Sequence, residues 1–168
     1  MIELVVGGAR SGKSAFALSR AEALGGSQNF VATATPWDSE MASRIKRHQL
    51  ERGPEWALRE CPLHLAQLAS EFKTGDTVLV DCLTLWLTNW LCGENPEGWQ
   101  DEQDQFLAAV GESDANWVLV SNETGMGIVP EGKLSRDFRD LSGWMHQAVA
   151  AVADSVTLVM FGLPQKLK

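Results

Sequence analysis

Short, continuous runs of apolar residues alternate along this chain with longer segments in which apolar residues recur at helical spacing. A continuous apolar run is typical of a strand that is covered on both faces, and such strands build parallel sheets. The predicted strands are Ile2–Val6, Asn29–Ala34, Thr77–Val80, Trp117–Val120 and Val156–Phe161. The predicted helices are Ser14–Leu24, Ser39–Arg52, Leu63–Phe72, Leu83–Leu91, Asp101–Val110 and Leu134–Ala153. This alternation predicts an α/β fold with a mostly parallel central sheet and helices on both faces.

Breaks in the pattern fall at residues that cannot continue a helix. Gly25-Gly26 closes the first predicted helix, and Gly53-Pro54 closes the second. The segment 55–62 is predicted to be a connector without regular structure. No internal repeat, low-complexity segment or linker interrupts the chain, so we expect residues 1–168 to form a single catalytic domain.

The first predicted strand leads directly into Gly7-Gly8-Ala9-Arg10-Ser11-Gly12-Lys13-Ser14, and a predicted helix follows. This segment matches the phosphate-binding loop G-x-x-x-x-G-K-[ST] at every position and in the required strand-then-helix context. Glycines let successive backbone N–H groups face an anion, and the helix N-terminus adds positive partial charge. We expect Lys13 to reach the β- and γ-phosphates and the Ser14 hydroxyl to hold a bridging Mg²⁺. The sequence therefore predicts a P-loop NTPase-like protein that binds a nucleoside triphosphate.

Residues that follow the predicted strands are the next candidates, because ligands of open parallel sheets bind outside the carboxyl ends of the strands. Thr33, Ala34 and Thr35 are small and would let a nucleotide approach the backbone. Asp81 follows the third strand and is placed as a Walker B carboxylate that holds Mg²⁺ opposite Ser14. The alternative for Asp81 is a helix N-cap for the segment that begins at Cys82.

The fourth predicted strand ends in a segment that differs from the guanine-recognition element of GTPase switch proteins. That element reads Asn-Lys-x-Asp, whereas this chain has Asn122-Glu123-Thr124-Gly125. The loop Gly125–Pro130 is apolar and rich in glycine. Such a loop favours a substrate lid or a subunit contact over a catalytic element, and the pattern leaves both open.

The predicted helix Ser39–Arg52 contains the most informative polar pattern. Arg44, His48 and Arg52 recur every four residues and therefore share one helix face. Two guanidinium groups disfavour protonation of an imidazole between them and can grip a phosphate, which suits a histidine that attacks phosphorus. The alternative is a solvated charged face, because other charged residues surround these three. His64 and His146 have no such neighbours along the chain and are interpreted as structural.

Composition narrows the class of protein. The formal net charge of −8 and a pI near 4.8 argue against a nucleic-acid-binding protein, which would present a basic face. The three cysteines form no C-x-x-C pair, and their odd number suits a reducing compartment. Met1 leads straight into a strand, and the longest apolar run is shorter than the ~20 residues of a membrane span. We therefore expect a cytoplasmic protein without signal peptide or membrane span.

Several motifs, in order and at fitting spacing, resemble one known family. They are the Gly7–Ser14 loop, Ala32-Thr33, Arg44-Ile45-x-x-His48-x-x-x-Arg52, Asn122-Glu123-x-Gly125-Met126-Gly127-Ile128-Val129-Pro130, and Phe138-Arg139-Asp140 with Gly143. Together they resemble the bifunctional adenosylcobinamide kinase / adenosylcobinamide-phosphate guanylyltransferase family of adenosylcobalamin biosynthesis. The resemblance spans essentially the whole chain. The Arg44–Arg52 motif and the Asn122–Pro130 motif are far more specific than the P-loop.

The resemblance implies two reactions. The enzyme phosphorylates the aminopropanol hydroxyl of the corrinoid adenosylcobinamide with ATP or GTP. It then transfers GMP from GTP to that phosphate, giving adenosylcobinamide-GDP and pyrophosphate. A histidine of the family carries GMP as a phosphoramidate, and His48 is the matching position, with Arg44 and Arg52 placed to stabilise the developing charge.

The resemblance also implies a nucleotide site and an assembly. Besides the P-loop, the site would comprise Ala32, Thr33, Ala34, Gln49, Leu50, Glu51, Arg52, Glu60 and Asp81. Family members are typically homotrimers with a short antiparallel strand at the edge of the parallel sheet. The apolar Leu83–Leu91 helix would then form a subunit contact or a corrinoid-binding surface.

Two positions depart from the family pattern, and two other functions compete. Asp81 stands where a well-known member has glutamate, which changes the reach to the metal, and His146 stands where the family often has asparagine. One competing function is a small-molecule P-loop kinase without nucleotidyl transfer, for which His48 is dispensable. The other is a GTP-binding regulatory protein, against which the missing Asn-Lys-x-Asp element counts.

Overall fold

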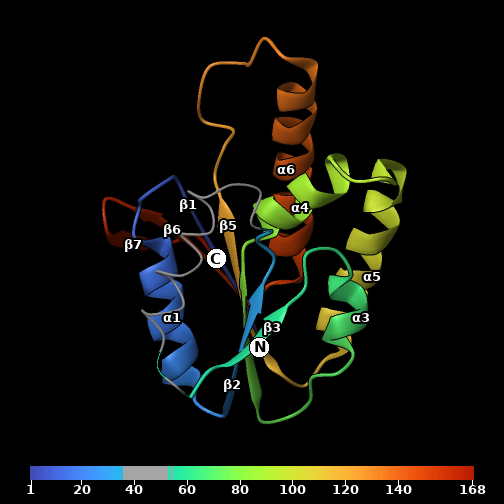
Figure 1. Ribbon diagram of the computed structural model, residues 1–168. Helices are drawn as coiled ribbons and strands as arrows, with labels where there is room; N and C mark the ends of the chain where they lie inside the picture. The colour runs from blue at the N-terminus through green and yellow to red at the C-terminus, as the bar shows by residue number, and fades with distance from the viewer. Residues whose placement is uncertain (36–52, 54) are drawn as a thin grey trace.

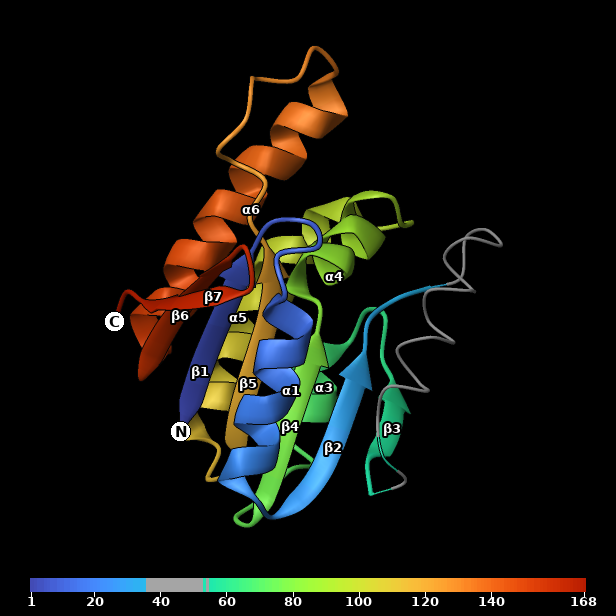
Figure 2. The ribbon, with the colours of Figure 1, turned by 90° about the vertical axis from the view of Figure 1, so that its left-hand side faces the viewer.

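A computed structural model describes residues 1–35, 53 and 55–168, and these residues build one sheet covered by helices on both faces (Figures 1 and 2). In this part of the chain the sheet has seven strands in the order β3-β2-β4-β5-β1-β6-β7. Neighbouring strands are parallel except for the β6–β7 pair, which is antiparallel. The strands are β1 Ile2–Gly7, β2 Ser27–Ala32, β3 Ala57–Glu60, β4 Asp76–Asp81, β5 Asn116–Asn122, β6 Ser155–Met160 and β7 Leu163–Lys166.

Helix α1 covers one face of the sheet, and the other helices of the described residues cover the opposite face (Figures 1 and 2). The helices are α1 Lys13–Leu24, α3 Leu65–Ala69, α4 Leu83–Leu91, α5 Trp99–Glu112 and α6 Lys133–Val152, with the 3₁₀ turn η1 Pro96–Gly98 before α5. Alternate residues of β1 serve the two sides, since Leu4 and Val6 belong to the core under α3–α6 and Val5 to the core under α1. The predicted α/β class with a mostly parallel sheet is therefore confirmed.

An ion pair between an exposed arginine and a buried carboxylate fixes α1 to the sheet. The Nε of Arg20 on α1 donates to both carboxylate oxygens of Glu3 on β1, at 3.1 and 3.0 Å. The Glu3 side chain is buried, so the pair supplies the partner that a buried carboxylate requires. This contact holds the helix that begins in the P-loop directly over the strand that ends in it.

The tryptophans of α4 lie in the core. Trp86 is completely buried, with ring centroids 4.7 Å from Trp99 and 5.1 Å from Phe106 of α5. The indole N–H groups of Trp86 and Trp90 both donate to the carbonyl of Leu63. These tryptophans therefore pack inside the chain and order the α3–α5 layer. The expectation that this apolar helix forms a subunit contact or a corrinoid surface stays a prediction.

The structure adds two strands to the five predicted ones. β3 lies in the segment predicted to be a connector, is exposed along its length and is held by parallel pairing with β2. β7 forms a hairpin with β6, and Phe161 at its turn has a left-handed φ of 56°. This hairpin is the short antiparallel edge that the family resemblance implies. The predicted helix Ser39–Arg52 lies outside the described residues.

No helix among the described residues is long and apolar enough to cross a membrane.

Candidate functional site

The phosphate-binding loop connects β1 to α1 in a tight, glycine-dependent turn. Gly12, which precedes α1, has a φ of 94°, and Arg10 has a φ of 55°. A Cβ atom added to Gly7 would lie 2.5 Å from both the Ser11 hydroxyl oxygen and the Val159 carbonyl oxygen. The glycines at positions 7 and 12 are thus required by the close approach and by the backbone conformation, respectively.

Neighbouring strands support this loop from both sides. The N–H of Glu123, just after β5, donates to the Gly7 carbonyl at 3.0 Å. The N–H of Gly162, in the β6–β7 turn, donates to the Ser11 carbonyl at 2.8 Å. The Ser11 hydroxyl is buried and has no hydrogen-bond partner among the described residues. The loop is therefore held in shape by backbone contacts that leave its concave side to a ligand.

Lys13 lies over the loop that it is predicted to serve. Its Nζ donates to the Gly8 carbonyl at 3.1 Å, and the residue is only 8% exposed. A buried ammonium beside the N-terminus of a helix gives this site a positive potential, which suits a polyphosphate.

A row of predicted site residues lies at the carboxyl ends of β3, β2 and β4. Ala32 is in register with Glu60 on one side and with Asp81 on the other. The pKa of the neighbouring Cys82 thiol is raised to about 11, first by burial and then by the Asp81 carboxylate, while the Lys13 ammonium lowers it. The Cys82 thiol is therefore near enough to both the Asp81 carboxylate and the P-loop lysine to interact with their charges.

Thr33 supports this edge from beneath and is completely buried. Its Oγ1 donates to the Cys82 carbonyl and accepts from the Cys82 N–H, each at 2.8 Å, and its own N–H donates to the Asp81 carbonyl at 3.3 Å. Asn89 of α4 donates to the Thr33 carbonyl at 2.8 Å. Thr33 therefore fixes the link between Asp81 and Cys82, a peptide bond that is cis.

The end of β5 carries a cluster that sequence reasoning missed. The Nε2 of His146, from α6, lies 2.7 Å from the Ser121 hydroxyl, and its Nδ1 lies 3.8 Å from the Glu123 carboxylate. Burial lowers the pKa of His146, although the nearby Glu123 carboxylate acts in the opposite direction. No motif in the sequence links His146 to Ser121 or Glu123, which lie far from it along the chain. The fold brings His146 of α6 to the end of β5.

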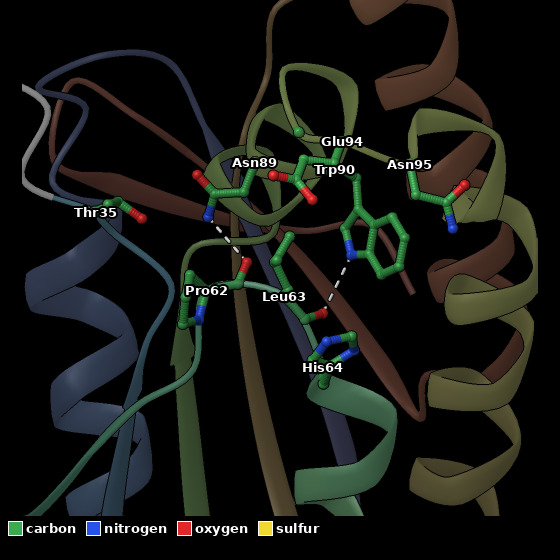
Figure 3. A pocket seen from close by; sticks show the side chains of 9 residues that line it. Thr35, Pro62, Leu63, His64, Asn89, Trp90, Glu94 and Asn95 are labelled. Atoms are coloured by element: carbon green, nitrogen blue, oxygen red, sulfur yellow. Dashed lines mark hydrogen bonds between the residues drawn. The ribbon is translucent and has the colours of Figure 1, made fainter.

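A separate pocket of about 400 Å³ lies beyond the end of β2 (Figure 3). Its lining residues are Thr35, Pro62, Leu63, His64, Asn89, Trp90, Gly93, Glu94 and Asn95. The Asn89 amide donates to the Pro62 carbonyl at 2.9 Å and the Trp90 indole to the Leu63 carbonyl at 3.1 Å, so α4 fixes the wall formed by residues 62–64. The His64 and Trp90 rings meet edge to face with centroids 6.0 Å apart.

The predicted nucleophile and its neighbours lie outside the described residues. These positions are Arg44, His48, Gln49, Leu50, Glu51 and Arg52. The remaining candidates, Gly7–Ser14, Ala32–Ala34, Glu60 and Asp81, all lie along the carboxyl edge of the sheet. Their roles stay predictions.

The donor chemistry at this edge fits Mg²⁺. A serine hydroxyl and a carboxylate, from Ser14 and Asp81, are the hard oxygen ligands that this ion takes. The described residues contain no group of three or more His, Cys, Asp or Glu side chains that could hold a metal ion by themselves. The two protein oxygens are therefore suited to an ion that is shared with nucleotide phosphates.

A parallel sheet with a P-loop between its first strand and first helix, and an acidic residue ending a nearby strand, defines a P-loop nucleotide-binding protein. The model of the cobinamide kinase / cobinamide phosphate guanyltransferase family matches residues 3–167. The chain belongs to this family of enzymes, which confirms the resemblance drawn from the motifs.

Curated relatives match over the whole length. The bifunctional adenosylcobalamin biosynthesis protein CobP of Pseudomonas aeruginosa is 46% identical over 100% of this chain and 98% of its own. The corresponding protein CobU of Salmonella typhimurium is 43% identical over 100% of both chains. A KaiC-like protein from Pyrococcus horikoshii covers 94% of this chain and 69% of its own, with 15% identity and a TM-score of 0.49, a likeness that carries no argument about function.

Proposed function

We propose that this protein phosphorylates adenosylcobinamide with ATP or GTP and then transfers GMP from GTP to the product, giving adenosylcobinamide-GDP. The observation that carries this proposal is the family match over residues 3–167, which includes the P-loop and every strand end described above. The full-length relatives are bifunctional adenosylcobalamin biosynthesis proteins, which supports the same two-step chemistry.

The P-loop binds the triphosphate in both steps. Backbone N–H groups of residues 7–14 and the Lys13 ammonium face the β- and γ-phosphates, where the helix N-terminus adds its positive partial charge. Ser14 and Asp81 would hold Mg²⁺, which supplies charge neutralisation for the phosphates when it is bound. Ala32 and Ala34 leave space beside the sheet edge for the nucleotide, with Thr33 beneath them and Glu60 on the adjoining strand.

His48 is the nucleophile of the second step in this proposal. Its ring nitrogen forms a bond to the α-phosphorus of GTP while the bond to the β-bridging oxygen breaks and pyrophosphate leaves. An oxygen of the cobinamide phosphate then attacks the same phosphorus and releases the histidine. Arg44 and Arg52 stabilise the charge on the α-phosphoryl oxygens, and Gln49–Arg52 complete the guanine nucleotide site.

The proposal extends to a single-domain homotrimer in the cytoplasm. The loop after β5 and the first turns of α6 project from the rest of the chain (Figures 1 and 2). Met126, Ile128, Val129 and Leu134 on this projection are exposed. An exposed apolar projection of this kind supports a contact between subunits.

Incubation with α-labelled GTP and Mg²⁺, followed by denaturing electrophoresis, tests the second step. We expect an acid-labile, alkali-stable label on the wild type and on His64→Ala, and no label on His48→Ala. A wild type that binds GTP and phosphorylates adenosylcobinamide but takes no label would reduce the function to that of a kinase. A wild type that does neither would refute the proposal.

A further inference from the structure

We propose that Glu123 is the catalytic base of the kinase step, the group that takes the proton from the corrinoid hydroxyl as it attacks the γ-phosphorus. This inference rests on the proposed function and assigns a residue to a role that the P-loop and Asp81 leave open. It is carried by the position of Glu123, by the way its carboxylate is held and by the chemistry of the two steps.

Glu123 follows the end of β5, beside the phosphate-binding loop. β5 is inserted between β1, which ends in the P-loop, and β4, which ends in Asp81. Gly7 is in register with Asn122, and the Glu123 N–H donates to the Gly7 carbonyl at 3.0 Å. Asp81 is in register with Val120, so Glu123 lies three residues further along the chain, outside the carboxyl edge of the sheet, where the terminal phosphate of a bound nucleotide belongs.

One group holds the carboxylate of Glu123, and a second lies close to it. One oxygen accepts the N–H of Gly125, and the other lies 3.8 Å from Nδ1 of His146. The Glu123 side chain is 23% exposed and that of His146 is 13% exposed. The carboxylate is therefore held at a defined place while it keeps access to solvent, to which a base must return its proton.

His146 adds no positive charge beside this carboxylate. Burial lowers the pKa of the imidazole, which favours the neutral ring near pH 7. A neutral ring that accepts from the Ser121 hydroxyl at Nε2 carries its proton at Nδ1, on the side of Glu123.

The kinase step needs such an acceptor and the guanylyl transfer does not. In the first step the corrinoid oxygen forms a bond to the γ-phosphorus, the bond to the β,γ-bridging oxygen breaks, and the nucleoside diphosphate leaves with the electron pair. The hydroxyl proton passes to Glu123 and then to water. In the second step the nucleophiles are a neutral imidazole nitrogen and a phosphate oxygen that is already anionic, so no hydroxyl proton has to be removed.

Separate assays of the two steps test this assignment. The kinase step is followed with γ-labelled ATP and adenosylcobinamide, and the guanylyl transfer with α-labelled GTP and supplied adenosylcobinamide phosphate. For Glu123→Gln we expect kcat of the kinase step to fall by about 10²- to 10⁴-fold, the range of general-base catalysis, while guanylyl transfer stays within about threefold of wild type. Glu112→Gln, exposed at the end of α5 that precedes the amino end of β5, is the matched control and should retain both activities.

Glu123→Asp is a second variant that tests the same assignment if Glu123→Gln does not fold. It keeps the charge but withdraws the carboxylate by about one C–C bond, ~1.5 Å, so we expect kinase kcat to fall at least about tenfold with guanylyl transfer preserved. A kinase rate within threefold of wild type in either variant, or equal losses in both steps, would overturn the assignment of Glu123. Absence of both activities in the wild type would instead refute the proposed function, so the two failures are distinguishable.

Discussion

Replacing Thr33 with valine tests whether the buried link at the end of β4 holds the nucleotide site together. Valine has nearly the same shape but no hydroxyl, so both hydrogen bonds between Thr33 and the Cys82 backbone are lost. The Cys82 carbonyl keeps the N–H of Trp86 at 3.2 Å, whereas the buried Cys82 N–H loses its 2.8 Å acceptor. The perturbation is therefore one orphaned donor plus one lost acceptor contact.

The expected cost follows from these two losses. A buried donor without a partner costs about 1–3 kcal/mol and the second hydrogen bond contributes roughly 1 kcal/mol, so we expect Thr33→Val to lower the free energy of unfolding by about 2–4 kcal/mol. For a domain of this size that corresponds to a fall in Tm of roughly 4–16 °C. Since the same link positions Asp81, affinity for GTP with Mg²⁺ should fall as well.

Urea unfolding and GTP titration of three proteins measure these effects. Thr33→Ser is the matched control, because it keeps both hydrogen bonds and loses one buried methyl group, at a cost of about 1 kcal/mol. We expect the order of stability to be wild type, then Thr33→Ser, then Thr33→Val. A Thr33→Val protein as stable as Thr33→Ser would refute the reasoning that these hydrogen bonds hold the edge.

Two further predictions concern the P-loop and α6. Gly7→Ala places a Cβ 2.5 Å from the Val159 carbonyl oxygen and should lower the free energy of unfolding by about 1–3 kcal/mol in the same urea titration. Gly8→Ala is the control and should be nearly neutral, because its Cβ meets no atom of the described residues within 4 Å. Burial lowers the pKa of His146 below its ordinary 6.5, so the unfolded chain binds the proton first as the pH falls. The stability that this imidazole contributes above pH 6.5 is lost on acidification, and wild type should lose more unfolding free energy between pH 7.5 and 5.5 than His146→Asn. An equal loss in both proteins would contradict this account of the ring.

The regular elements that the sequence predicts are those whose own residues carry the signal. The five apolar strands are confirmed because burial on both faces requires apolar residues throughout, and this composition is visible without a partner. β3 has no such composition, since Ala57–Glu60 is exposed and is held by backbone pairing with β2. A strand that depends on a neighbouring edge leaves little trace in its own residues.

The candidate site likewise contains residues that the sequence predicts and residues that only the fold brings together. The Gly7–Ser14 loop is predicted from sequence because its function depends on backbone freedom and on a lysine at fixed spacing. The presence of Ala32, Glu60 and Asp81 at the site follows from the rule that strand ends carry the ligand, but the strand order decides that Ala32 lies between the other two. Thr33 shows the limit of the pattern, because a small polar residue at a strand end turns out to be buried beneath the surface it was expected to form.

By itself the sequence determined the fold class, the phosphate-binding loop and, through its motifs, the family. Each of these depends on residues that lie close together or recur at fixed spacing. Only the tertiary structure decided that the backbone of Glu123 binds the P-loop at Gly7 and that the ring of His146 lies beside the Glu123 carboxylate. Glu123 follows a strand and His146 lies on a helix, and these elements come together because the apolar core packs. The apolar pattern along the chain does not show which polar residues this packing will bring together.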